Sequence, residues 1–330
     1  MVLREKDSHC PGDILYYDGN TGAIFTMRKM NRVFKFRIYP NTEQRDLFAK
    51  TFGCCRFIYN KMLSDKIKYF EETGNNLKPT PAQYKNDFPW LREVDSLALA
   101  NVQLHLEAVY MNFFQRVSVK AMDDDIGFPS FKSKHKWHNS YTTNLVNGNI
   151  VLVDGSLKLP KLGKIKIKQH RQIPINHRLK SVTVSLTPAE KYYASLLYEY
   201  DIDITPIKPV DILELDFNIS QYPRSYFKAQ ERLVKEHRKL SQRKKGGSNY
   251  NRQRLKVARL QEYITNQQAD IFHKHSRQIA NNYDAVRVAE NNKKSIKYEK
   301  SLLDDDKNTF TQILDYKLIE QGKRLLKANK

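Results

Sequence analysis

The stretch VDILELD (residues 210–216) is an apolar run that ends in a carboxylate, and AVRVAE (285–290) has the same form. Runs of this length and composition indicate buried strands. Between them, helical periodicity covers about 224–243 and 250–281, joined by the polar segment KKGGSN (244–249). Strands separated by helices are typical of an α/β domain. Residues 206–330 are therefore predicted to form an α/β domain that contains a helical hairpin at 224–281.

Carboxylates at the ends of apolar strands are metal-ligand candidates, because two-metal phosphodiester chemistry needs several of them close together. Asp216 and Glu290 occupy this position in the two strands. Either acid alone would be interpreted as a capping or surface residue. Together, on either side of a basic hairpin, they are interpreted as relics of a metal site. Two carboxylates could still bind one hydrated Mg²⁺ ion weakly.

The charge of the chain indicates a polyanionic partner. Its 330 residues include 57 Lys and Arg against 36 Asp and Glu, a formal net charge of +21. Each cation that neutralises a phosphate releases condensed counterions, so an excess of this size favours nucleic acid. An ordinary basic protein is the alternative, and a membrane surface is a weaker one. No run of about 18 apolar residues and no signal peptide is present, so no membrane partner is expected.

The predicted hairpin carries the clearest electrostatic signal. Residues 224–259 contain thirteen Lys or Arg and two Glu. A solvated helix face normally mixes both signs. The one-sided balance therefore predicts contact with a phosphate backbone, which positions a protein on nucleic acid without reading its sequence. The candidate residues are Arg243, Lys244, Lys245, Arg252 and Arg254.

Upstream of the hairpin, the pattern predicts a small antiparallel barrel with a helical insertion. A strand is expected at 33–39, and short alternating stretches recur over 140–200, as is typical of such barrels. Helical spacing follows the cap at Pro40-Asn41-Thr42 and returns at 96–118. A last helix is expected at 308–326. The predicted domains are a leader of unknown role (1–29), a barrel (30–40 and 138–205), a helical domain (41–137) and the α/β domain (206–330).

Two smaller features bear on partners and cofactors. The segment GFPSFKSKHKW (127–137) mixes aromatic rings with cations, which suits base stacking and phosphate contact through Lys132 and Lys134. A hydrophobic anchor followed by a solvated basic loop is an equal alternative. The cysteines Cys10, Cys54 and Cys55 form no CxxC pair. No zinc site and no disulfide framework are therefore expected, and a reducing cytoplasm fits.

The stretches that carry a family resemblance include FRIYPN (36–41), GCCRFIYN (53–60), GFPSFKSK (127–134), KLPKLG (158–163) and RLKVA (254–258). In this order they resemble the TnpB (OrfB) family of bacterial insertion sequences, which are RNA-guided DNA nucleases. The resemblance covers about 30–327 and implies an α+β multidomain fold. In that fold, a small β-barrel (wedge) domain carries an inserted helical recognition domain and is followed by a RuvC domain of RNase H-like fold. It also implies a guide RNA, a double-stranded DNA target, and Asp216 and Glu290 as the first two RuvC acids.

The sequence departs from this family before the predicted helical hairpin and after the last predicted helix. Asp216 is followed almost directly by Tyr222-Pro223-Arg224, where the family has a further β-hairpin. The zinc ribbon and third acid of the family do not follow the last predicted helix, and Asp304-Asp305-Asp306 is expected in a loop. The RuvC-like domain is therefore predicted to be truncated and nuclease-dead, with no zinc and no requirement for Mg²⁺. A group of TnpB-like nuclease-dead repressors resembles this pattern.

These expectations combine into one predicted function. It is RNA-guided, sequence-specific DNA binding without cleavage, by a monomer that represses transcription by occluding a promoter in the bacterial cytoplasm, at the nucleoid. A nuclease with a residual or trans-completed site and a non-functional transposon remnant stay open as alternatives. The positions that match the family's DNA-reading surface are Ser96, Ala100, Asn101, Tyr141, Thr143 and Asn144.

Overall fold

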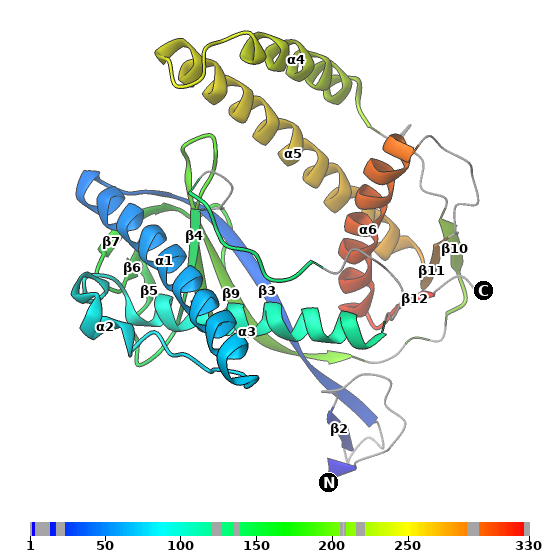
Figure 1. The fold of residues 1–330 in the computed structure, drawn as a ribbon. Coiled ribbons are helices and arrows are strands. Elements are labelled where there is room, and N and C mark those ends of the chain that lie inside the picture. The colour runs from blue at the N-terminus through cyan, green and yellow to red at the C-terminus, as the bar shows by residue number, and fades with distance from the viewer. Residues whose placement is uncertain are drawn as a thin grey trace. The chain divides into compact units, whose positions relative to one another are not determined.

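The computed structural model describes residues 2–3, 14–17, 24–119, 127–134, 139–204, 207, 209–215, 222–288 and 297–326. The chain divides into two compact units, one of residues 31–200 and one of residues 1–30 with 201–330. Figure 1 shows the elements of both units. Among the described residues, no helix combines the length and the apolarity that crossing a bilayer requires.

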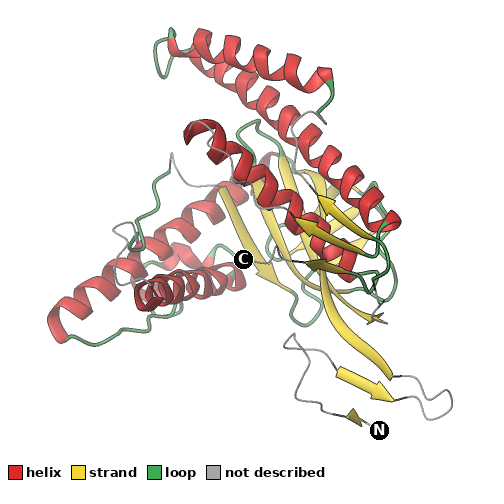
Figure 2. Ribbon diagram, turned by 90° about the vertical axis from the view of Figure 1, so that its right-hand side faces the viewer, coloured by secondary structure: helices red, strands yellow, loops and turns green. Residues whose placement is uncertain are grey.

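A curled sheet is the framework of the first unit (Figure 2). Its strand order is β4-β8-β9-β3-β7-β6-β5. Every second side chain of a strand points to the same face, so Phe36, Ile165, Val182 and Leu196 share a buried core. The order ends at β4 and β5, and no pairing joins these two in the part of the chain that is described, so closure into the expected barrel is not shown. The strands are β3 (Ile24–Tyr39), β4 (Asn139–Asn144), β5 (Val151–Val153), β6 (Ser156–Leu159), β7 (Gly163–Lys168), β8 (Arg178–Leu186) and β9 (Tyr192–Ile204).

Helices α1 (Thr42–Thr73) and α3 (Ser96–Val119) pack against each other and against β4. They confirm the helical spacing expected in this region. Asn41 caps α1 in a capping box with Gln44, because the Gln44 amide nitrogen donates to Asn41 Oδ1 (2.8 Å) and Gln44 Oε1 accepts from the Asn41 nitrogen (3.1 Å). Gly74 ends the helix in the left-handed conformation, at φ 70°. The short α2 (Tyr84–Asp87) and a 3₁₀ turn at Pro89–Arg92 connect the two long helices.

The second unit contains a three-stranded parallel sheet in the order β10-β11-β12. Its core joins Val286 of the sheet to Phe272, Phe310 and Leu314 of the helices. The strands are β10 (Ile212–Leu215), β11 (Ala285–Val288) and β12 (Arg324–Leu326). The helices are α4 (Arg224–Ser241), α5 (Ser248–Asn282) and α6 (Lys297–Ile319), of which α4 and α5 agree with the predicted hairpin.

The N-terminal prediction was incomplete. The segment 1–29, to which no element was assigned, contains β1 (Val2–Leu3), β2 (Ile14–Tyr17) and the first residues of β3. The residues Ile24–Met27 pair antiparallel with β2. Backbone pairing with a neighbouring strand, rather than side-chain alternation, therefore sets the start of β3.

The prediction for the C-terminal helix was wrong at both ends. α6 spans Lys297–Ile319 instead of 308–326, and the chain turns at Gly322 (φ 71°) into β12. The RLL triplet of β12 continues the apolar spacing of α6, and periodicity alone does not separate a short strand from the end of a helix. Asp304, Asp305 and Asp306 lie in α6 and not in a loop. The Asp306 carboxylate accepts hydrogen bonds from Tyr222 and Gln268.

Candidate nucleic-acid interface

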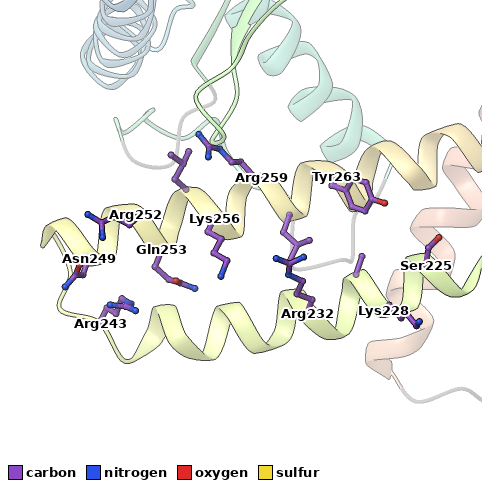
Figure 3. A pocket seen from close by; sticks show the side chains of 13 residues that line it. Ser225, Lys228, Arg232, Arg243, Asn249, Arg252, Gln253, Lys256, Arg259 and Tyr263 are labelled. Carbon is purple, nitrogen blue, oxygen red and sulfur yellow. The ribbon is translucent and has the colours of Figure 1, made fainter.

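Helices α4 and α5 lie side by side and form a groove of about 920 Å³. Arg232 of α4 and Gln253 and Lys256 of α5 point toward the facing helix (Figure 3). Six of the lining residues are Lys or Arg and none is Asp or Glu. The lining residues are Ser225, Lys228, Ala229, Arg232, Arg243, Asn249, Arg252, Gln253, Leu255, Lys256, Arg259, Leu260 and Tyr263.

The cations of this groove are exposed and mostly uncompensated. Lys256 lies 3.0 Å from Glu236, and among the described residues the other five have no carboxylate within ion-pair distance. Like charges that gather in a concave surface raise the local potential and attract polyanions. The groove is therefore suited to a phosphate backbone, and an exposed Tyr263 ring at its side adds a surface for stacking.

A buried carboxylate joins the two helices below this charged surface. Glu236 of α4 is buried, and Gln253 of α5 donates its Nε2 to the Glu236 carboxylate (2.8 Å) and to the Glu236 carbonyl (3.0 Å). Lys256 and Lys239 complete the contacts, at 3.0 and 3.2 Å. The Gln253 hydrogen bond, followed by that of Lys256, lowers the pKa of Glu236 to about 2. One of the two glutamates in the basic stretch thus holds the hairpin together.

Protonation of Glu236 is expected to weaken the protein in acid. Its folded-state pKa of about 2 lies below the unfolded value of 4.5, so its contribution is complete above pH 4.5 and is lost as the pH falls toward 2. We expect Glu236→Gln to lower the thermal midpoint at pH 7 and to flatten its dependence on pH in this window. Glu231→Gln, on the exposed part of α4, is the control and should leave both unchanged. An equally steep acid dependence in both variants would contradict this role.

The predicted backbone contacts of the hairpin separate into three groups. Arg243 and Arg252 line the groove. Lys244 and Lys245 are exposed in the connection between the helices, and Arg254 is exposed on α5 outside the groove lining. The prediction missed Lys228, Arg232, Lys256 and Arg259, although all four belong to the basic stretch 224–259 that carried the charge signal.

Lys132 was predicted as a phosphate contact, with a hydrophobic anchor and a solvated basic loop as the alternative, and the structure places it in a half-buried position. Lys134 is exposed, but Lys132 is half-buried, with Nζ 3.4 Å from the centre of the Tyr59 ring. Burial lowers the pKa of Lys132 to about 7. Asn60 of α1 holds its backbone from both sides, since Oδ1 accepts from the Lys132 nitrogen (2.8 Å) and Nδ2 donates to its carbonyl (3.0 Å). Lys132 therefore belongs to a cavity wall and not to an exposed basic loop.

The six predicted DNA-reading positions differ in exposure, and two of them, Asn101 and Tyr141, line one cavity. Ser96 and Ala100 are exposed on α3, and Asn101 and Asn144 are half-buried. Tyr141 and Thr143 are buried, because they occupy alternate inward positions of β4.

The inward pair has structural contacts instead. Tyr141 packs against Phe48 and Phe52, with ring centres 6.2 and 5.9 Å away. Thr143 donates to Asp95 (2.5 Å), whose other oxygen accepts from the Leu97 nitrogen at the start of α3. The Thr143 side chain is thus buried and bound to Asp95, and DNA reading at this position stays a prediction. A single sequence does not show which alternate residues of a strand face the core.

The two predicted acids, Asp216 and Glu290, lie outside the described residues. The strands that precede them, β10 and β11, are parallel neighbours, with Leu215 opposite Val288. Parallel strands end at the same edge of a sheet. Within the described ranges, no group of three or more His, Cys, Asp or Glu side chains is arranged to hold a metal ion.

Two family profiles match the chain. The helix-turn-helix domain of OrfB from IS605 matches residues 27–75, and the probable transposase OrfB of IS605 matches residues 216–297. The first segment folds as a strand, β3, followed by one long helix, α1. The second begins after β10 and contains the whole α4–α5 hairpin.

Three curated proteins are similar to the chain. A "Putative RNA-guided DNA endonuclease" of Streptomyces pristinaespiralis is 27% identical over 91% of this chain and 78% of its own length. The "Putative RNA-guided DNA endonuclease InsQ" of Escherichia coli K12 is 27% identical over 79% of this chain and 66% of its own length. "Virulence protein VsdF" of Salmonella dublin is 32% identical over 32% of this chain and 96% of its own length. With both OrfB profiles matched in order, the chain is similar to the OrfB proteins of IS605 in these two segments and to the two RNA-guided DNA endonucleases over most of its length.

Proposed function

We propose that this protein is an RNA-guided, sequence-specific binder of double-stranded DNA that represses transcription by occupying a promoter without cutting it. The observation that carries the proposal is the groove between α4 and α5, with six Lys or Arg side chains and no acid. Such a surface binds backbone charge and shape, while base pairing with a guide RNA supplies the sequence. The names of two relatives, which describe RNA-guided DNA endonucleases, support the same pair of partners.

Occupancy without cleavage is the finer part of the proposal. It rests on the sequence after Asp216, where only residues 217–223 precede α4, in place of the β-hairpin found in the family. Metal-assisted cleavage requires acids held in a defined geometry, whereas occupancy requires the cationic groove and the guide. Asp216 and Glu290 would hold an ion if one binds. We propose that the guide RNA is the only cofactor needed and that no zinc and no Mg²⁺ are required.

The competing function is an RNA-guided endonuclease, which the names of the relatives favour. It shares every binding step with the first proposal and differs only in the fate of the DNA. A cut would require Mg²⁺ and the Asp216 carboxylate. An assay of DNA cleavage in the presence of Mg²⁺ therefore distinguishes the two functions.

The test begins with the RNA that co-purifies with the protein from its native cell. We expect one abundant RNA with a constant scaffold and a variable end that matches a promoter. The loaded complex should retard a duplex with that match and leave it intact in Mg²⁺, and Asp216→Ala should behave like the wild type. A nick that disappears in Asp216→Ala would establish the endonuclease instead. Absence of any enriched RNA would overturn guided binding altogether.

A further inference from the structure

The groove between α4 and α5 has an apolar floor beneath its cations. Ala229 of α4 and Leu260 of α5 both line it. Ala229 belongs to the core of the second unit, and Leu260 packs against that core. Six exposed Lys and Arg side chains line the same groove, and two of them, Arg232 and Lys256, reach into the space between the helices (Figure 3). The groove therefore combines positive charge with a small apolar surface.

An aromatic ring lies at one end of this groove. The Tyr263 side chain of α5 is 51% exposed and belongs to the lining. Gln267, one turn further along α5, donates its Nε2 to the Tyr263 hydroxyl (2.8 Å), which restrains the ring before any ligand binds. Figure 3 shows Tyr263 at the same end as Ser225 and Lys228 of α4. An exposed ring beside cations is the combination on which unpaired bases stack.

The dimensions of the groove favour one strand of nucleic acid over a duplex. From Arg252 to Tyr263, the lining of α5 extends over about 16 Å at the helical rise. The axes of two packed helices lie roughly 8–10 Å apart. A duplex is wider than this, since its major groove alone spans about 12 Å. It would therefore contact the cations without reaching Ala229 or Leu260, whereas the bases of an unpaired strand are free to enter.

We propose that the groove between α4 and α5 holds a single-stranded stretch of nucleic acid, with phosphates on its cations and an unpaired base stacked on Tyr263. Stacking and backbone charge tolerate every base, so this contact reads no sequence. The inference deepens the proposed function and rests on it for the two sources of such a strand. These are an unpaired part of the guide RNA and the DNA strand that the guide displaces, which share this chemistry.

The test uses the full chain, freed of co-purified RNA, and three labelled probes of equal length. The probes are oligouridine, oligothymidine and the duplex of oligouridine with oligoadenine. In fluorescence anisotropy at physiological salt, we expect the better single strand to bind roughly tenfold more tightly than the duplex. Tyr263→Ala should weaken binding of that strand by roughly fivefold to a hundredfold and leave the duplex unaffected. Tyr263→Phe keeps the ring and should bind all three probes as the wild type does.

Phe227→Ala is the matched control. Phe227 is an exposed ring of α4 outside the groove lining, so its removal should leave the affinity for every probe unchanged. The two single-stranded probes identify the source of the strand. A preference for oligouridine would assign the groove to unpaired guide RNA, and a preference for oligothymidine would assign it to the displaced DNA strand.

Two results would overturn the single-strand assignment. One is a wild type that binds the duplex as tightly as either single strand. The other is a Tyr263→Ala protein that keeps its full affinity for single strands or loses affinity for all three probes alike. Failure of the proposed function has a different signature, because no guide RNA would then co-purify with the protein, while the preference for single strands and its dependence on Tyr263 would remain.

Discussion

Reversal of three groove cations, in the combination Arg232→Glu, Arg252→Glu and Arg259→Glu, should abolish formation of the nucleic-acid complex. All three side chains line the groove and are exposed. Each reversal removes a phosphate contact with its counterion release and adds a repulsive charge. We expect affinity for the guide RNA and its target to fall by at least about a thousandfold at physiological salt. Fluorescence anisotropy over a salt series measures both the affinity and its slope.

The matched control reverses three exposed cations of α4 that do not line the groove. Its substitutions are Arg224→Glu, Lys235→Glu and Arg238→Glu. This variant has the same net charge as the groove variant, so long-range attraction is equal in the two proteins. Only the groove variant should lose the complex. An equal loss in both would show that total charge, and not the groove, drives binding.

Replacement of Lys317 by Met should stabilise the protein at neutral pH. Lys317 of α6 is 3% exposed, and its Nζ donates to the His273 carbonyl (2.6 Å) and to Ser276 Oγ (2.7 Å), both neutral acceptors. Burial, followed by the nearby Arg277, lowers the pKa of Lys317 from 10.5 to about 8. Its charge therefore costs folding free energy at pH 7, and an apolar side chain of similar volume avoids that cost. We expect a gain of about 1–3 kcal/mol, after the lost hydrogen bonds are subtracted.

The dependence of stability on pH tests whether the charge of Lys317 destabilises the folded protein. Between pH 8 and 10.5 the unfolded chain holds the Lys317 proton and the folded chain releases it, so the wild type should gain stability as the pH rises. Lys317→Met should lack this gain, as denaturant unfolding at several pH values would show. The control is Lys323→Met, because half-buried Lys323 also donates to a carbonyl, that of Ala280 (2.7 Å), and its loss should cost at most about 1 kcal/mol. A Lys317→Met protein less stable than the wild type at pH 7 would contradict the argument.

Local chemistry predicted the helices of this fold better than its sheets. The capping box of Asn41 and Gln44 and the left-handed Gly74 are readable from neighbouring residues, and α1 begins and ends at them. Strand β12 was missed because its pairing with β11 joins segments far apart in sequence. The same holds for β2 and for the first residues of β3, Ile24–Met27, which pair with each other and lack a regular apolar alternation. Strand register depends on a partner that periodicity does not identify.

In the candidate site, the sequence predicted the location of the positive charge but not the contacts between the helices. The charge balance of 224–259 located the cationic groove, since a count of Lys and Arg requires no knowledge of packing. It did not predict that Glu236 meets Gln253, because that contact depends on how α4 packs on α5. Nor did it predict the buried position of Thr143 or the half-buried position of Lys132. Burial of a polar side chain is a property of tertiary structure, and family resemblance does not supply it.

The Gln44 side chain has a consequence for how the chain folds. Besides closing the cap of α1, its Nε2 donates to the carbonyls of Leu162 and Lys164, which lie 118 and 120 residues away in sequence. Closing a loop of that length carries an entropic penalty that slows the search for the native state. Early formation of α1 and α3 would shorten the flexible chain between β3 and β7. The inserted helices would thereby speed the pairing of β7 with β3. The rate-limiting step of folding would then be that late strand docking and not the growth of any helix.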